Sequence, residues 1–208
     1  MNYGQFKNRV LKLLNQYSVA GQTVAPTYNN QQDYLNRIPS LTNDAMREIA
    51  MTARKIPMLL DLATLEPEDL GETLRYELPD DFYAFQSGGT TITTTDGIVL
   101  HTNVYSYQGR KYLLVPKRED GAYTITYYRY PAMLPDKPDE DTELDNEPDT
   151  HDAAAFYVAA FLVIHDDSFL FSSFYNKYED KLAKTGPGVS TEVKSVGDAY
   201  GVVGTPGV

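Results

Sequence analysis

The sequence AYTITYYRY (residues 122–130) leads through a proline-containing acidic segment, residues 131–149, into the apolar run AAAFYVAAFLVI (residues 153–164). The first part is rich in aromatic and β-branched residues, which predicts a strand. The last part is apolar on nearly every side. It predicts a helix that must be enclosed, either by its own bundle or by a neighbouring subunit. The chain therefore passes from a sheet, across a negative loop, into a core helix.

Apolar residues recur at helical spacing before this stretch. Residues 2–17 carry the pattern of an amphipathic helix, and a second helical region spans about 30–55. Pro39 either kinks this second helix or splits it, because proline lacks a backbone donor and disfavours helical geometry in the residue before it. Ser40, Thr42 or Asn43 would then cap a restarted helix.

A last helix is predicted after the apolar run. Asp166 and Asp167 break or bend the chain there, and Thr150 or Asp152 caps the apolar helix itself. Four apolar residues then follow at four-residue spacing, namely Leu170, Phe174, Tyr178 and Leu182.

Between the helical regions the hydrophobic period changes to that of strands. Alternation begins at Thr73, and turn signals occur at Asp96-Gly97, Gln108-Gly109 and Asp120-Gly121. Four or five short antiparallel strands are expected between Thr73 and Tyr130. Residues 58–72 are ambiguous between a short helix and an apolar connector.

These elements predict an α+β fold: a four-helix-type bundle of two N-terminal and two C-terminal helices, with an inserted antiparallel β module and a flexible tail. The expected division is N-terminal helices in 1–72, a β-sheet or barrel in 73–131, an acidic loop in 132–150, C-terminal helices in 151–185 and an extended tail in 186–208.

Composition excludes several classes of protein. The 208 residues include no cysteine, which rules out a disulfide framework and a thiolate metal site. No signal peptide is apparent, and the longest apolar run, 153–164, is shorter than the roughly 18–20 residues that span a bilayer. The formal net charge is −11, of which residues 135–149 contribute −7. Without a basic patch, tight binding of nucleic acid is not expected, although lining a channel through which DNA slides is compatible with this charge.

Catalytic machinery is not expected. The chain has no nucleophile-elbow, Walker or Rossmann glycine pattern. The three histidines, His101, His151 and His165, fall in different predicted elements, and neither Asp80-Asp81 nor Asp166-Asp167 has the spacing of a metal site or of a glycosidase pair. We therefore predict no catalytic residue, no metal and no cofactor.

Tyrosine is unusually frequent, with 17 residues. Tyrosines in the strand region are explained by sheet packing, by a subunit interface or by stacking on a ligand such as a sugar. The candidate interface residues are Tyr105, Tyr107, Tyr123, Tyr128 and Tyr130.

Two further segments are candidates for contacts with partners. The acidic loop is either a solvated, self-repelling linker or a negative surface that faces a basic partner or passing DNA; its candidate residues are Asp136, Asp139, Glu140, Asp141, Glu143 and Asp145. The C-terminal tail is expected to be disordered alone, yet it carries apolar residues that suit docking on another subunit: Val193, Val196, Tyr200, Val202 and Val203.

The order of these features resembles the head–tail adaptor (connector, head-completion) proteins of tailed bacteriophages. The likeness rests on the pattern L-x-N-x-A-x-R-E-I-A from Leu41, on YELPDDF (76–82), on YYRYP (127–131), on LDNEP (144–148) and on AAFYVAA (154–160). It covers most of residues 28–183.

This resemblance implies a non-enzymatic virion protein, assembled in the host cytoplasm, that forms a homo-oligomeric ring, commonly of twelve copies, below the portal. In that family the bundle forms the ring, the β insertion faces tail or tail-completion proteins, the C-terminal tail reaches into the portal, and double-stranded DNA passes through. The alternative is a Tyr-rich module that binds carbohydrate or another surface ligand. Neither hypothesis involves a membrane.

Overall fold

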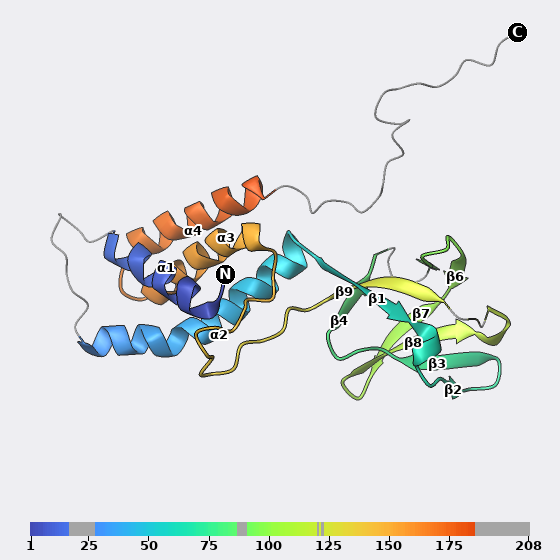
Figure 1. Ribbon diagram of the computed structural model, residues 1–208. Coiled ribbons are helices and arrows are strands. Elements are labelled where there is room, and N and C mark those ends of the chain that lie inside the picture. The colour runs from blue at the N-terminus through green and yellow to red at the C-terminus, as the bar shows by residue number, and fades with distance from the viewer. Residues whose placement is uncertain (17–27, 87–90, 120, 122, 186–208) are drawn as a thin grey trace, which may run out of the picture.

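The structure, a computed structural model, describes residues 1–16, 28–86, 91–119, 121 and 123–185. Helices lie at both ends of the described chain, and antiparallel sheets lie between them (Figure 1). This arrangement confirms the predicted α+β class. The candidate tail residues Val193, Val196, Tyr200, Val202 and Val203 lie outside the described residues.

Four helices of the described chain pack into one bundle: α1 (Tyr3–Gln16), α2 (Tyr28–Thr52), α3 (His151–Val163) and α4 (Ser168–Lys184). Helix α3 is central and packs against the other three. Ten of its thirteen residues are buried. The small side chains of its alanines let neighbouring helices approach closely, and Phe6, Met46 and Phe174 fill the space between the helices. The chain's own bundle therefore encloses all of the apolar helix except the partly exposed side chains of Asp152, Tyr157 and Phe161.

Helix α2 runs from Tyr28 to Thr52 with Pro39 inside it, so the helix is not split. Pro39 is buried, and the Thr42 hydroxyl donates a 2.7 Å hydrogen bond to the Ile38 carbonyl within the same helix. The predicted cap at Ser40, Thr42 or Asn43 is therefore wrong, because the tertiary packing of a long apolar face outweighs the backbone bond that proline removes.

Helices α3 and α4 begin close to the predicted positions, directly after Thr150 and Asp167. Asp167 caps α4, since its carboxylate accepts 2.9 Å bonds from the Phe169 and Leu170 amides. Thr150 occupies the cap position of α3 but makes no capping bond. Its hydroxyl donates instead to the Glu147 carbonyl at 2.7 Å, so the predicted capping role of Thr150 is wrong.

The strands of the described chain form three antiparallel sheets. One has the order β1 (Ile56–Asp61), β9 (Thr124–Arg129), β4 (Phe82–Phe85). The second has the order β2 (Glu68–Asp69), β3 (Thr73–Glu77), β8 (Arg110–Pro116), β7 (Asn103–Tyr107). The third pairs β5 (Thr91–Thr93) with β6 (Val99–His101). Their buried side chains form a hydrophobic core separate from that of the bundle.

The predicted turns at Asp96-Gly97 and Gln108-Gly109 are confirmed. Gly97 has φ +81°, and Gln108 and Gly109 have φ +50° and +78°, which are left-handed conformations typical of tight hairpins. They join β5 to β6 and β7 to β8. The turn predicted at Asp120-Gly121 involves Asp120, which lies outside the described residues.

Residues 62–64 form a short 3₁₀ helix, but residues 56–61 form strand β1 and 68–69 form β2, so neither alternative for residues 58–72 included the two strands. The sequence there does not alternate, and Met58 and Leu59 are both exposed, so no period-2 signal exists. Strand β1 pairs with β9, a partner distant in sequence. The described residues between Thr73 and Tyr130 hold seven strands rather than four or five.

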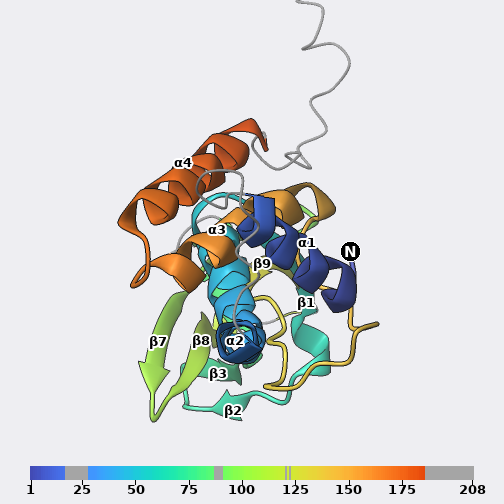
Figure 2. The ribbon, with the colours of Figure 1, turned by 90° about the vertical axis from the view of Figure 1, so that its left-hand side faces the viewer.

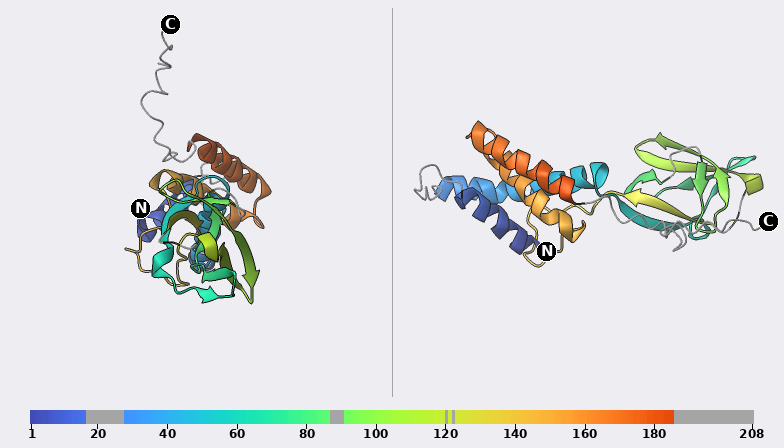
Figure 3. Two further views of the ribbon diagram at one scale, coloured as in Figure 1. Left: turned by 90° about the vertical axis from the view of Figure 1, so that its right-hand side faces the viewer. Right: turned by 90° about the horizontal axis from the view of Figure 1, so that it is seen from above.

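The sheets lie beyond the end of the bundle at which α2 finishes, so that the bundle and the sheets are arranged end to end (Figures 1 and 3). Only residues 53–55 separate α2 from β1, and the chain returns from β9 directly into the acidic segment, residues 131–149. The β module is thus held at the bundle by two crossing segments. The division of the chain into the five units given above remains a proposal.

The alanines of α3 leave no room for larger side chains. Ala159→Leu places three extra carbons where the exposed fraction is 0%, and should lower the free energy of unfolding by roughly 1–3 kcal/mol through overpacking. Urea denaturation monitored by circular dichroism measures this change. Ala183→Leu, at an exposed position of α4, is the matched control and should stay within about 0.5 kcal/mol of wild type. Equal stability of the two variants would contradict the central role of α3.

Candidate interaction surfaces and the junction of sheet and bundle

The paired carboxylates have structural partners. Asp81 accepts a 3.1 Å bond from the Tyr127 hydroxyl, and burial, together with this carboxylate, raises the pKa of Tyr127 to about 12. Asp166 accepts from the Tyr34 hydroxyl at 3.3 Å. Among the described residues, no group of three or more potential ligands is placed to hold a metal ion. No described helix has the length and hydropathy needed to cross a bilayer.

The junction between the sheet and the bundle is organised by Asp145. Its carboxylate accepts two bonds from the Arg129 guanidinium at the end of β9, one of them 2.7 Å long, and a 2.6 Å bond from the Ala132 amide. The Arg129 side chain is 17% exposed, and the Asp145 side chain is 29% exposed. The hydrogen bond from Arg129 lowers the pKa of Asp145, the amide of Ala132 adds to this, and burial opposes it. The pair joins the last strand to the acidic segment.

Aromatic rings and cations fill the space around this ion pair. The Tyr130 ring lies 4.6 Å from the Arg47 guanidinium carbon of α2 and 5.5 Å from the Lys111 ammonium of β8. Tyr83 packs against the same ring, with centroids 5.2 Å apart. The junction therefore contains both cation–π and aromatic contacts. The residues that make them come from α2, β4 and β8 and from the end of β9.

The acidic segment is anchored to the bundle. Leu134 and Leu144 are 7% and 6% exposed and belong to the bundle core. Asn43 of α2 binds the backbone of Leu134 twice, accepting from its amide at 2.7 Å and donating to its carbonyl at 2.9 Å. The segment is therefore packed along the bundle, and the hypothesis of a solvated, self-repelling linker does not describe it.

The same segment satisfies the start of α1. The carbonyls of Thr142 and Glu140 accept 2.8 Å bonds from the amides of Tyr3 and Gly4, which have no partner within the helix. Glu140 forms an ion pair with Lys7, and Glu143 lies 3.4 Å from the N-terminal amine. Negative groups at this end also suit the dipole of the helix. A Cβ at Gly4 would lie only 3.0 Å from that of Glu140, so a larger residue here would require Glu140 to shift by a few tenths of an ångström.

The six candidate acidic residues thus fall into three groups. Asp136, Asp139 and Asp141 are exposed and form no ion pair with described residues. Glu140 and Glu143 are exposed but paired. Asp145 is half-buried against Arg129. Asp145 therefore has an arginine partner, and a second arginine, Arg54, binds Asp149 of the same segment at 2.7 Å.

The five candidate tyrosines occupy separate places. Tyr105 stacks on Tyr112 with centroids 5.5 Å apart and accepts a 3.2 Å bond from Arg75. Tyr107, at the end of the same strand, is 54% exposed. Tyr123 packs against the core of the β module, whereas Tyr128, under the Lys55 ammonium at 4.9 Å, and Tyr130 lie at the junction. A role for these tyrosines in an interface stays a prediction.

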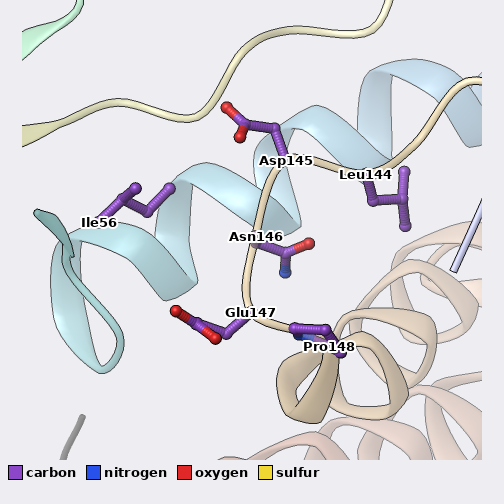
Figure 4. Close-up of a pocket in the computed structure, with 6 residues that line it drawn as sticks. All are labelled: Ile56, Leu144, Asp145, Asn146, Glu147 and Pro148. Atoms are coloured by element: carbon purple, nitrogen blue, oxygen red, sulfur yellow. The ribbon is translucent and has the colours of Figure 1, made fainter. Parts of the chain in front are cut away.

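A shallow hollow of about 230 Å³ lies beside the junction, lined by Ile56, Leu144, Asp145, Asn146, Glu147 and Pro148 (Figure 4). It lies where the acidic segment crosses from α2 to the start of α3. Its lining offers carboxylates and an amide among apolar carbons. It contains no nucleophile paired with a base, so the arrangement supports packing rather than catalysis.

His151 is a buried residue whose environment the sequence pattern did not reveal. It is 2% exposed at the start of α3, and its Nε2 has no hydrogen-bond partner in the described part of the chain. Burial lowers the pKa of His151, and the positive N-terminal amine lowers it further. The backbone of Asn146 and the carboxylates of Glu143 and Asp149 oppose this shift. A lone histidine at a helix start carries no burial signal of its own.

Comparison with known protein families places the chain. The family model described as SU10 adaptor protein matches residues 1–200. No curated protein matches the chain.

The ion pair at the junction should contribute measurably to stability. Asp145→Asn removes the charge that Arg129 and the Ala132 amide bind, and we expect the free energy of unfolding to fall by about 2 kcal/mol, the scale of charge-assisted bonds in partly buried sites. Urea denaturation at neutral pH measures the loss. Asp141→Asn, an exposed carboxylate of the same segment, should change stability by less than about 0.5 kcal/mol. Equal effects would exclude Asp145 as an anchor.

Protonation of His151 should destabilise the bundle. A lowered pKa in the folded state means that the unfolded state takes up the proton first, so stability falls as the pH drops below about 6.5, the ordinary pKa of a histidine. Between about pH 7.5 and about pH 5.5, where carboxylates titrate little, wild type should lose a few degrees of melting temperature, and His151→Gln should lose less. His165→Gln, at an exposed bend, should retain the wild-type pH difference. An unchanged difference in His151→Gln would refute this assignment.

Proposed function

This chain belongs to the SU10 adaptor protein family, a family of phage head–tail adaptors, and from that premise we propose that it forms a ring below the portal, joins head to tail and lets DNA pass. The observation that carries the proposal is the match over residues 1–200, which includes both the bundle and the β module. Such adaptors are structural proteins and normally have no enzymatic activity. A phage adaptor is a component of the virion, assembled in the host cytoplasm.

The two-part form of the chain supports this role. The bundle and the β module lie end to end, each with its own hydrophobic core (Figure 1). In the proposed ring, a dodecamer in keeping with the number common in such proteins, the bundles pack side by side. The β modules then meet tail or tail-completion proteins, while the segment after residue 185 docks on the portal through Val193, Val196, Tyr200, Val202 and Val203.

The charge of the chain supports passage of DNA without retention. Many copies of a chain with net charge −11 would surround a channel whose walls repel phosphate groups. Asp136, Asp139 and Asp141 are exposed and not neutralised by described residues. Of the six candidate acids, these three remain available to such a surface.

The alternative function, a Tyr-rich module that binds carbohydrate, has less support. Tyr105 and Tyr128 are occupied by Arg75, Tyr112 and Lys55 of the same chain. Of the five candidate tyrosines, Tyr107 alone is exposed by more than half. A sugar platform requires several free rings on one face.

A nonsense mutation early in the coding sequence tests the function in the phage. We expect filled or leaking heads without tails under the electron microscope and a loss of infectious particles, both restored when the full chain is supplied in trans. A chain ending at residue 185 should fold yet fail to restore infectivity, because it lacks the proposed portal-docking tail. Tailed, infectious particles formed without the chain would exclude the adaptor role.

A further inference from the structure

One side of the bundle presents aromatic rings that the four helices leave partly uncovered. Tyr157 and Phe161 of α3 are half-buried, unlike most of that helix, and Phe171 and Tyr175 of α4 are half-buried beside them. Neighbouring ring centroids lie 4.5 Å apart for Tyr157 and Phe161, 5.7 Å for Phe161 and Phe171, and 5.6 Å for Phe171 and Tyr175. We call these four side chains the aromatic face.

Carboxylates border the aromatic face. Burial raises the pKa of Tyr157, and the charges of Asp44 and Glu48 raise it further, which places both carboxylates near this ring. The charge of Glu48 also raises the pKa of Tyr178, the buried neighbour of Tyr157. Asp44 and Glu48 lie four residues apart on α2 and are exposed. Neither forms an ion pair with a described residue. An aromatic surface with a negative border attracts a cation.

The aromatic face points away from the contact between α1 and α3. Asp152 of α3 binds Arg9 of α1 at 3.3 Å and Lys181 of α4 at 3.0 Å. Phe161 lies nine residues further along α3, which at about 100° per residue puts it on the opposite side of that helix. Figures 2 and 3 show α1 on one side of the bundle and α4 on the other.

Helix α1 offers the complementary surface. It carries three cations and no acid, whereas each of the other helices contains an acidic residue. Its outward side is formed by Gln5, Asn8 and Lys12, which are exposed and spaced three and four residues apart. Lys7 and Arg9 have partners in Glu140 and Asp152. Lys12 forms no ion pair with the described residues.

We propose that the aromatic face of one copy binds the outward side of α1 from the next copy, with Lys12 between the rings and the carboxylates of Asp44 and Glu48. This inference rests on the proposed ring and names the subunit contact within it. Two different, complementary surfaces on opposite sides of one subunit form a heterologous interface, which closes into a ring when the rotation between copies is right. A self-complementary surface would stop at a dimer.

The absence of cysteine makes this contact accessible to site-directed crosslinking. Asn8→Cys adds a thiol one turn from Lys12, and Ser172→Cys adds one next to Phe171; both positions are exposed. With a short bismaleimide, the full-length double variant, assembled on portal, should give a ladder of products beyond the dimer on a denaturing gel. Each single variant should give no ladder. A double variant that assembles into rings but yields no ladder would overturn the proposed contact.

Charge exchange provides an independent test. Lys12→Glu or Glu48→Lys alone should reduce the fraction of full-length chain in rings assembled on portal at least tenfold in mass photometry, and the combined exchange should restore it. Glu66→Lys, an exposed site of the β module, makes the same charge change as Glu48→Lys and should leave ring formation unaltered. Circular dichroism confirms that each variant is folded.

The outcomes separate this contact from the function on which it rests. Rings that form equally well with every variant would place the contact elsewhere and leave the adaptor role intact. A wild-type chain that forms no ring even on portal would overturn both proposals. Crosslinks from residues 8 and 172 to a different phage protein alone would overturn the contact between copies and assign these surfaces to that partner.

Discussion

The enclosure of helix α3 is the constraint on which the rest of the structure depends. A helix that is apolar on every side cannot lie at a surface, so three other helices must surround it. Two of these come from the N-terminal third of the chain and one follows α3 directly. Because the residues between α2 and α3 contribute no helix to this core, they are free to form a module of their own. The insertion of a β module is thus a consequence of which helices α3 requires.

The two parts of the chain are joined by polar contacts rather than by a shared core. Arg129 at the end of β9 reaches Asp145, and Tyr130 lies against Arg47 of α2. Charge-assisted bonds and cation–π contacts depend strongly on geometry. They therefore set the orientation of the β module relative to the bundle, although they bury little apolar surface. A module held this way keeps a defined orientation relative to the bundle.

Local patterns predicted the elements that local physics determines. The helical spacing of α1 and α4, the apolar run of α3 and the glycine turns at 97 and 109 each carry their signal within a few residues. Strand β1 was not predicted because its apolar residues do not alternate with polar ones, and Leu59 is exposed. Its partner β9 is distant in sequence, so no local pattern indicates the pairing. The restart expected at Pro39 failed because packing on α3 outweighs one missing backbone bond.

The partners of individual acids were also beyond the sequence. Eight carboxylates in residues 135–149 look alike as a charge run, but Asp145 binds Arg129 while Asp141 faces solvent. Only the fold decides which cations lie within reach. The aromatic rings show the same limit, since Tyr157 and Phe161 belong to a run whose other members are mostly buried. Periodicity marks that run as apolar and does not distinguish the side left partly uncovered.

Enclosure of α3 within one chain also bears on how a ring would form. A helix left bare would force association at once, because its apolar area would drive subunits together at any concentration. With α3 covered, what remains between copies in the proposed contact is a few aromatic rings and unpaired charges, an interface whose strength falls with salt and with dilution. A chain of this kind is stable alone and associates where a template raises its local concentration. In the proposed ring, assembly confined to a portal would follow from that difference, and it would keep free subunits from closing rings away from the head.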